Sequence, residues 1–200
     1  MATFLLGVDE AGRGPLAGPV AVGIVLVPAF LSVEETFPGV ADSKALSPEK
    51  REELFLILER YASCGILRYT VEFASAGVID ERGITYAVRS CVNKGVRTLA
   101  PEPESHLILL DGLLKAPQEY EQKTIIDGDA SEPIISLASI AAKVKRDRLM
   151  QKLAKQYPGY GFEEHKGYGT PRHQEAIKKL GLCAIHRRTY GLQTLDKSRI

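Results

Sequence analysis

The segment Phe4-Leu5-Leu6-Gly7-Val8-Asp9-Glu10-Ala11-Gly12-Arg13-Gly14 is the most informative part of the sequence, because an apolar run meets two acids and then a glycine-rich turn. The run from Thr3 to Val8 predicts a buried strand. Two adjacent carboxylates at the end of such a strand are costly unless a cation joins them. The turn that follows can bring backbone N–H groups and Arg13 close to a phosphate. The stretch therefore predicts a metal site beside a phosphate site.

Apolar and helical patterns along the rest of the chain predict a sheet covered by helices. The five predicted strands are Thr3–Val8, Pro19–Val27, Gly65–Phe73, His106–Leu110 and Lys123–Ile126. The predicted helices run from Ser47 to Tyr61, from Asp80 to Val96, from near Ser131-Glu132-Pro133 to about Gln156, and from Pro171 to Leu180. The short link from Val8 to Val20 suits antiparallel neighbours, and the long segment from Phe73 to Leu107 has room for a crossover to a parallel strand. We therefore predict an α/β fold with a five-stranded mixed sheet flanked by helices.

The composition describes one domain. With 200 residues, 44% of them hydrophobic and 26% charged, the chain can build one sizeable core but is short for two. We expect a core over residues 1–156, with a C-terminal helical cap and tail over residues 157–200 packed on it. No apolar run is long enough for a bilayer and no leader pattern is present, so a cytoplasmic protein without a membrane partner is expected. Cys64, Cys91 and Cys183 form no paired motif and are expected to be free thiols.

The small net charge of +1 hides an asymmetry. Residues 143–190 carry 12 Lys or Arg against 4 Asp or Glu, a local charge of +8. Residues 1–142 carry 12 against 20, a local charge of −8. This division favours a polyanionic partner for the C-terminal part and cation binding for the N-terminal part. A solvated basic helix surface would give the same count.

Acids follow three of the predicted strands. Asp9 and Glu10 follow the first, Asp111 follows the fourth, and Asp127 and Asp129 follow the fifth. Neighbouring strands lie about 4.8 Å apart, so acids at adjacent strand ends converge. Carboxylates without a matching set of His or Cys favour Mg²⁺ or Mn²⁺, and two such ions can support phosphodiester hydrolysis. Spacing leaves the choice between Asp127 and Asp129 open, and each acid alone is also an ordinary turn or cap residue.

Further polar groups are expected around these acids. Four share one face of the third predicted helix, namely Ser136, Ser139, Lys143 and Arg146. They could hold a nucleic-acid backbone or form a solvated face. The segment Asp42-Ser43-Lys44 precedes the capped helix at Ser47 as a second candidate phosphate contact. The segment His165-Lys166-Gly167-Tyr168 offers basic groups and an aromatic ring for stacking.

Together these segments resemble the ribonuclease HII family, the type 2 ribonucleases H. The motifs that carry the resemblance occur in family order: Val8 to Val20, Asp42-Ser43-Lys44, Asp111-Gly112, Gly128-Asp129, Ala138 to Val144 with Arg146-Asp147-Arg148, His165-Lys166-Gly167-Tyr168 and His186-Arg187. The first motif is highly specific, and the set extends from residue 8 to about residue 190. The sister family ribonuclease HIII has Glu as its fourth acid, whereas Asp129 stands there in this chain.

The resemblance implies a ribonuclease H-like fold and a specific activity. The implied enzyme is an endoribonuclease that hydrolyses the RNA strand of RNA–DNA hybrids and incises on the 5′ side of ribonucleotides embedded in duplex DNA. It would use two metal ions, Mn²⁺ or Mg²⁺. Nothing in the sequence points to an obligate protein partner, so a monomer is expected.

The resemblance also assigns residues. The acids that match the family's catalytic metal ligands are Asp9, Glu10, Asp111 and Asp129, which selects Asp129 over Asp127. The implied nucleic-acid contacts are Gly12, Arg13 and Gly14 at the 2′-OH, Tyr168 at the following sugar, and Ser43, Lys44, Ser139 and Lys143 along the backbone. Arg146 and Lys166 complete the predicted contacts by charge and position.

Three positions depart from the family pattern, and two rival functions stay open. Asp127, Gly83 and Leu113 stand where Lys, Asn and Asn are common, although the four acids are intact. A non-catalytic nucleic-acid-binding module would use the basic C-terminal part without the acids. A different nuclease of the same broad fold, such as a junction resolvase or a transposase-like enzyme, would act on all-DNA substrates.

Overall fold

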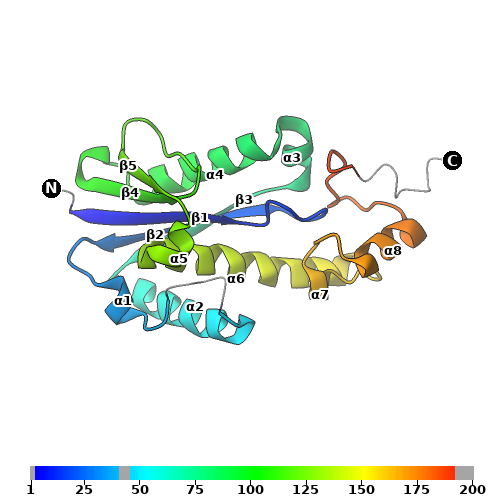
Figure 1. Cartoon of the computed structure of the whole chain (residues 1–200), viewed down its shortest axis with the longest axis horizontal. Helices are drawn as coiled ribbons and strands as arrows, with labels where there is room; N and C mark the ends of the chain where they lie inside the picture. Colours follow the sequence, from blue (N-terminus) through cyan, green and yellow to red (C-terminus); the bar gives the residue numbers. More distant parts are fainter. Residues whose placement is uncertain (1–2, 41–45, 192–200) are drawn as a thin grey trace.

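A computed structural model describes residues 3–40 and 46–191 of the chain. Its sheet contains five strands in the order β3-β2-β1-β4-β5 (Figure 1). The strands are β1 (Phe4–Ala11), β2 (Val20–Pro28), β3 (Arg68–Ala74), β4 (His106–Asp111) and β5 (Glu121–Ile125). The β1–β2 and β2–β3 pairs are antiparallel, and the β1–β4 and β4–β5 pairs are parallel. The predicted five-stranded mixed sheet is confirmed.

Helices cover both faces of this sheet (Figure 1). They are α1 (Val33–Thr36), α2 (Pro48–Ser63), α3 (Ala76–Arg82), α4 (Ile84–Leu99), α5 (Gly128–Ser131), α6 (Pro133–Gln156), α7 (Phe162–His165) and α8 (Pro171–Leu180), with a 3₁₀ turn at Pro103–Ser105. α2 begins as the sequence predicts, because the Ser47 side chain accepts a hydrogen bond from Lys50 N. Of the helices described, none is both long and apolar enough to cross a bilayer.

Some predicted boundaries are wrong. The single helix expected from Asp80 to Val96 is divided at Gly83, whose φ of 82° ends α3 before α4 starts. The helix predicted to begin near Ser131-Glu132-Pro133 does so, starting at Pro133, because a proline suits the first turn of a helix. β1 continues through Asp9 to Ala11, since β2 pairs with it beyond the point where β4 stops.

The order of the strands is a point that the sequence prediction leaves open. β4 runs in the same direction as β3, as expected for a crossover connection, but it lies beside β1. This arrangement makes β1 the central strand, with Asp111 of β4 ending next to it. Acids from two separate segments are therefore brought to the same end of the sheet.

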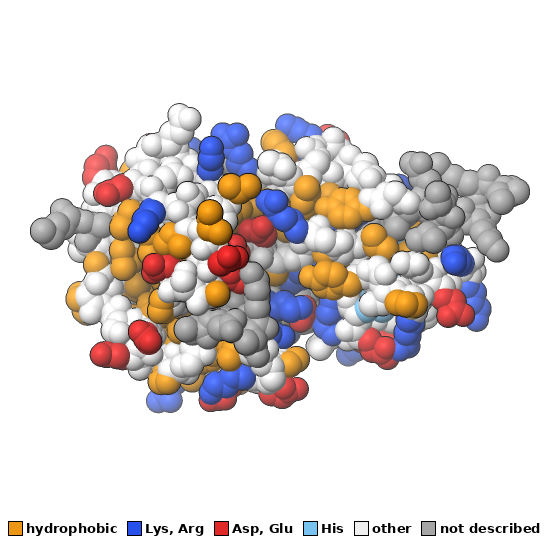
Figure 2. Space-filling view, in the orientation of Figure 1, with side chains coloured by type: hydrophobic (Ala, Val, Ile, Leu, Met, Phe, Trp, Pro, Cys, Tyr) orange, Lys and Arg blue, Asp and Glu red, His pale blue; other side chains and the backbone are white. Residues whose placement is uncertain are grey.

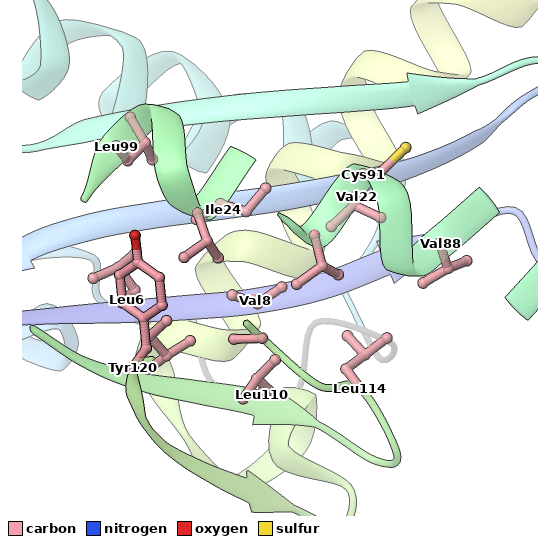
Figure 3. Close-up of a cluster of buried hydrophobic side chains, with 14 of the residues drawn as sticks. Leu6, Val8, Val22, Ile24, Val88, Cys91, Leu99, Leu110, Leu114 and Tyr120 are labelled. Atoms are coloured by element: carbon pink, nitrogen blue, oxygen red, sulfur yellow. The ribbon is translucent and has the colours of Figure 1, made fainter. Parts of the chain in front are cut away.

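Two hydrophobic cores hold the layers together. Val22 and Ile24 of β2 point into the core beneath α4, which Figure 3 shows with Leu6, Val8, Cys91 and Leu110. The alternate residues Val25 and Val27 belong to the core on the opposite face, beneath α2 and α6. A strand that serves two cores is apolar throughout, which explains why β2 reads as one continuous hydrophobic run.

α6 packs unusually close to the sheet. A Cβ atom at Gly7 would lie 2.2 Å from Ile134 O, and one at Gly23 would lie 2.1 Å from Ala138 O. The backbone of α6 therefore rests on β1 and β2 where both strands lack side chains. This contact sets the position of the polar residues that α6 carries next to the acids of β1.

Candidate active site

A cleft of about 540 Å³ lies at the end of the sheet where β1 and β4 carry their acids. Figure 2 shows acidic side chains near the middle of this face, with basic side chains close beside them. The cleft is lined by Asp9, Glu10, Ala11, Gly12, Arg13, Gly14, Arg51, Asp111, Asp129, Ser139, Lys143 and Tyr168. Residues far apart in the sequence thus converge on one concave surface.

Asp9 is a buried carboxylic acid in this cleft. It is 4% exposed and faces Gly23 across the β1–β2 ladder. Burial raises the pKa of Asp9 to about 7, and the charges of Glu10 and Asp111 add to the rise, while a hydrogen bond with Ser139 opposes it. An ionised Asp9 therefore destabilises the folded chain until a positive charge enters the cleft.

One carboxylate oxygen of Glu10 makes an ion pair, and the other has no hydrogen-bond partner among the described residues. Arg13 Nε lies 2.9 Å from Glu10 Oε1. Burial raises the pKa of Glu10, although Arg13 acts in the opposite direction. Glu10 Oε2 is buried and has no hydrogen-bond partner among the described residues. A buried carboxylate oxygen without a donor is a ligand position for a cation.

Asp111 and Asp129 meet although they belong to different elements. Asp111 is the last residue of β4, and its Oδ1 accepts a hydrogen bond of 3.3 Å from Asp129 N in α5. Asp129 is 1% exposed, and its carbonyl accepts a hydrogen bond of 2.5 Å from Ser136 Oγ. Asp127 caps α5 with a φ of 51°, is exposed, and does not line the cleft.

The four acids form an open arrangement. Within residues 3–40 and 46–191, no three His, Cys, Asp or Glu side chains meet in a group compact enough to hold a metal ion by themselves. The donor set nevertheless fits a hard cation, because it contains only carboxylate oxygens and includes the unpaired Glu10 Oε2. Water or substrate oxygens would have to complete the coordination.

Two buried arginines hold the glycine-rich loop from behind. Arg187 donates to the carbonyl oxygens of Gly12, Arg13 and Gly18 at 2.7, 2.7 and 3.0 Å. Arg146 donates to the carbonyl of Pro19 at 2.9 Å. With the carbonyls of Gly12 and Arg13 engaged on the inner side, the shape of the loop is fixed by guanidinium groups that never reach the surface.

Gly12 shows how close this contact is. Its φ is 90°, and a Cβ atom there would lie 2.0 Å from Arg146 Nε. Glycine is required at this position both for the backbone angle and for the space that Arg146 occupies. The glycines of the motif are therefore part of the packing as well as of the cleft wall.

Tyr168 reaches the cleft from the C-terminal segment. It is 44% exposed, and its carbonyl oxygen lies 2.9 Å from His173 Nδ1 of α8. The preceding Gly167 carbonyl accepts a hydrogen bond of 2.8 Å from Leu16 N. A small core of Ala17, Met150, Tyr160, Phe162 and Ala176 anchors the segment on α6. The C-terminal segment thus places an aromatic ring beside the glycine-rich loop.

The interpretation of the polar stripe on α6 is only partly correct. Ser139 and Lys143 line the cleft, and Lys143 Nζ lies 2.9 Å from Asp147 Oδ1. Ser136 and Arg146 are fully buried and bind backbone carbonyls, so they cannot contact a nucleic acid from these positions. The four residues do lie along one side of α6, as their spacing predicts. That side is partly at the surface and partly in the core, so only two of the four reach the cleft.

The remaining predicted contacts lie elsewhere. Lys166 borders a neighbouring groove of about 740 Å³, with its Nζ donating to the carbonyl of Glu163. Ser43 and Lys44 fall outside the described residues. Arg51 lines the cleft from the first turns of α2, and the sequence analysis did not predict it as a contact. Its position four residues after the Ser47 cap could have indicated a basic side chain near the start of this helix. The burial of Arg187 had no sequence signal.

Comparison with known proteins agrees with this geometry. The ribonuclease HII family model matches residues 6–192. A ribonuclease HII of Endomicrobium trichonymphae is 46% identical over 185 residues, which cover 92% of this chain and 83% of the relative.

Solved structures show the same fold. The ribonuclease H2 of Pyrococcus horikoshii OT3 is 33% identical with a TM-score of 0.71, and the match covers 93% of each chain. The ribonuclease HII of Archaeoglobus fulgidus, solved in complex with PCNA, is 27% identical with a TM-score of 0.74, over 92% of this chain and 93% of that one. The predicted ribonuclease H-like fold is confirmed. The chain therefore belongs to the ribonuclease HII family and is a nuclease.

Proposed function

We propose that this protein hydrolyses the RNA strand of RNA–DNA hybrids and incises on the 5′ side of ribonucleotides embedded in duplex DNA. One observation carries the proposal: four acids and the Gly12–Gly14 loop line the same cleft. A site that contains both can combine hydrolysis of a phosphodiester with inspection of the sugar beside it. A DNA-binding module would need neither the buried acids nor the unpaired carboxylate oxygen.

The acids have a defined part in this reaction. Asp9, Glu10, Asp111 and Asp129 would hold divalent cations, Mg²⁺ or Mn²⁺, against the scissile phosphate. Two such ions, once bound, would supply an activated water and a stabilising charge for the leaving 3′-oxygen. The Ser139 hydroxyl, which is hydrogen-bonded to Asp9, keeps that carboxylate oriented and favours its ionised form.

The rest of the cleft would bind and select the substrate. Gly12, Arg13 and Gly14 would meet the ribose 2′-OH, since the loop is rigidly held and presents its outer side to the cleft. The exposed ring of Tyr168 would stack on the following sugar. Lys143 would exchange its contact with Asp147 for a phosphate oxygen.

We also propose a monomer that works in the cytoplasm. The Archaeoglobus relative was solved with PCNA, so a sliding clamp is the first protein partner to test. The division into a core over residues 1–156 and a cap over residues 157–200 is likewise a proposal.

A matched pair of acid variants tests the assignment of the site. Asp111→Asn is expected to reduce cleavage of a ribonucleotide-containing duplex by at least about 100-fold, because a metal ligand is lost. Asp127→Asn is the control: it is the same change beside the site, and Asn tolerates the left-handed backbone that Asp127 adopts. Cleavage is measured on labelled duplexes in Mg²⁺ and in Mn²⁺. Full activity in Asp111→Asn, or an equal loss in Asp127→Asn, would remove the assignment.

A further inference from the structure

A second groove lies beside the cleft, between α4 and the loop that joins β4 to β5. Its volume is about 410 Å³. Arg13 lines both this groove and the cleft, so the two hollows share a wall. Figure 2 shows basic side chains over the region of α4 and this loop. The groove is thus continuous with the proposed active site.

The ionisable groups that line this groove are all cationic. They are Arg13, Arg89 and Lys115, and no carboxylate from the described residues is among the lining. Arg13 is paired with Glu10 of the cleft, but its side chain is still half exposed. The side chains of Arg89 and Lys115 are exposed and make no ion pair or hydrogen bond with any described residue.

The cations farther along α4 provide a contrast. Lys94 Nζ lies 2.7 Å from Glu72 Oε2, and Arg97 Nη2 lies 2.8 Å from Glu119 Oε1. These ion pairs are what a solvated helix surface normally shows. Arg89 and Lys115, which face the groove, have no such partners in the part of the chain that the structure describes, although residues 1–142 carry a net charge of −8.

The groove also has an apolar floor and an apolar rim. Val88, Val92 and Leu114 are buried beneath it, and Leu113 stands at its edge with 92% of its surface exposed. Leu113 follows directly on Asp111-Gly112, where the family pattern commonly has Asn. Sugars can pack against apolar side chains while phosphates meet cations, so this combination matches a sugar–phosphate backbone.

We propose that the groove between α4 and the β4–β5 loop binds the sugar–phosphate backbone of the substrate duplex outside the cleft. Arg89 and Lys115 contact phosphates, and Leu113 packs against a sugar at the boundary with the active site. The inference rests on the proposed function, because it assumes that a duplex occupies the cleft. It adds a binding surface from the acidic part of the chain, away from the basic C-terminal segment.

A charge-matched pair of double variants tests this surface. Arg89→Gln with Lys115→Gln removes two groove cations, whereas Arg60→Gln with Arg68→Gln removes two exposed cations at the end of α2 and the start of β3. Binding of a fluorescent duplex with one ribonucleotide is measured by anisotropy in EDTA at several salt concentrations. KM and kcat are measured in Mg²⁺ on the same duplex.

The groove variant is expected to bind roughly three- to thirtyfold more weakly than the unmodified protein. Its plot of log K against log salt should be shallower by about 2, one for each lost phosphate contact. KM should rise with kcat unchanged, and the control should match the unmodified protein. Equal affinity and equal salt slope in both double variants would overturn the proposal that this groove binds the duplex backbone. If the unmodified protein binds the duplex but cuts nothing, the proposed function is wrong. The salt slopes then still show whether the groove binds the duplex backbone.

Discussion

Single residues in the cleft are arranged for binding a cation rather than for stability. Asp9 is buried beside two other acids, and Glu10 has a buried oxygen without a donor. Asp129 is also buried, with only 1% of its surface exposed. The resemblance to the family was needed to select Asp129 as the fourth acid, because Asp127 follows the same strand and spacing alone cannot distinguish the two. The structure places Asp129 in the cleft and Asp127 outside it.

The pKa of Asp9 leads to a pH-dependent stability prediction. The ordinary value is 3.8 and burial raises it to about 7, so the folded state is penalised as pH rises from about 4 and fully penalised above 7. Asp9→Asn should therefore unfold at higher urea concentration than the unmodified protein at pH 8 in EDTA, by about 1 to 3 kcal/mol. The gain should shrink toward pH 5. A variant that is less stable at both pH values would contradict this account of Asp9.

At the scale of elements, the site depends on two contacts that hold α6 and the glycine-rich loop in place. The glycines of β1 and β2 admit the backbone of α6. Arg146 and Arg187 bind the inner carbonyls of the loop. Local signals predict where helices begin, as at Ser47 and at Thr170, whose side chain accepts from His173 N. They cannot predict which arginines are buried, because that depends on segments brought together only by folding.

The close packing of α6 is open to a direct test. Gly23→Ala should destabilise the fold by about 1 to 3 kcal/mol, because its Cβ would lie 2.1 Å from a backbone oxygen of α6. Gly77→Ala in α3 is the control, since its nearest neighbour lies at 3.7 Å and alanine favours a helix. Urea unfolding of both variants measures the difference. Equal stability of the two would show that α6 does not rest on β2 in this way.

The support of the loop predicts a functional effect for a residue outside the cleft. Arg187→Leu should reduce cleavage and destabilise the fold by about 2 to 4 kcal/mol, because three loop carbonyls lose a charged donor. Arg188→Leu is the control, since that neighbouring side chain is exposed. Cleavage of a single-ribonucleotide duplex and of an all-DNA duplex is compared, together with thermal unfolding. If Arg188→Leu has the larger effect, the loop is not held by Arg187.

For the whole molecule, the distribution of charge was only a partial guide. The count predicted an acidic N-terminal part for cations and a basic C-terminal part for a polyanion. The C-terminal segment does border the cleft through Tyr168, but it also buries Arg187 as structural support. Arg89 of α4 and Lys115 of the β4–β5 loop have no side-chain partner among the described residues, yet both lie inside the part with net negative charge. Summed charge cannot predict such a surface, because it ignores which side chains fold to the same face.

In our proposal, the acids and the glycine-rich loop form one ribonucleotide-dependent nuclease centre. The purified protein is incubated with Mg²⁺ or Mn²⁺ and two end-labelled duplexes that are identical except for one ribonucleotide. We predict a single cut on the 5′ side of the ribonucleotide, no cut in the all-DNA duplex, and no cut of either duplex in EDTA. Equal cutting of both duplexes, or cutting that persists in EDTA, would contradict the claim.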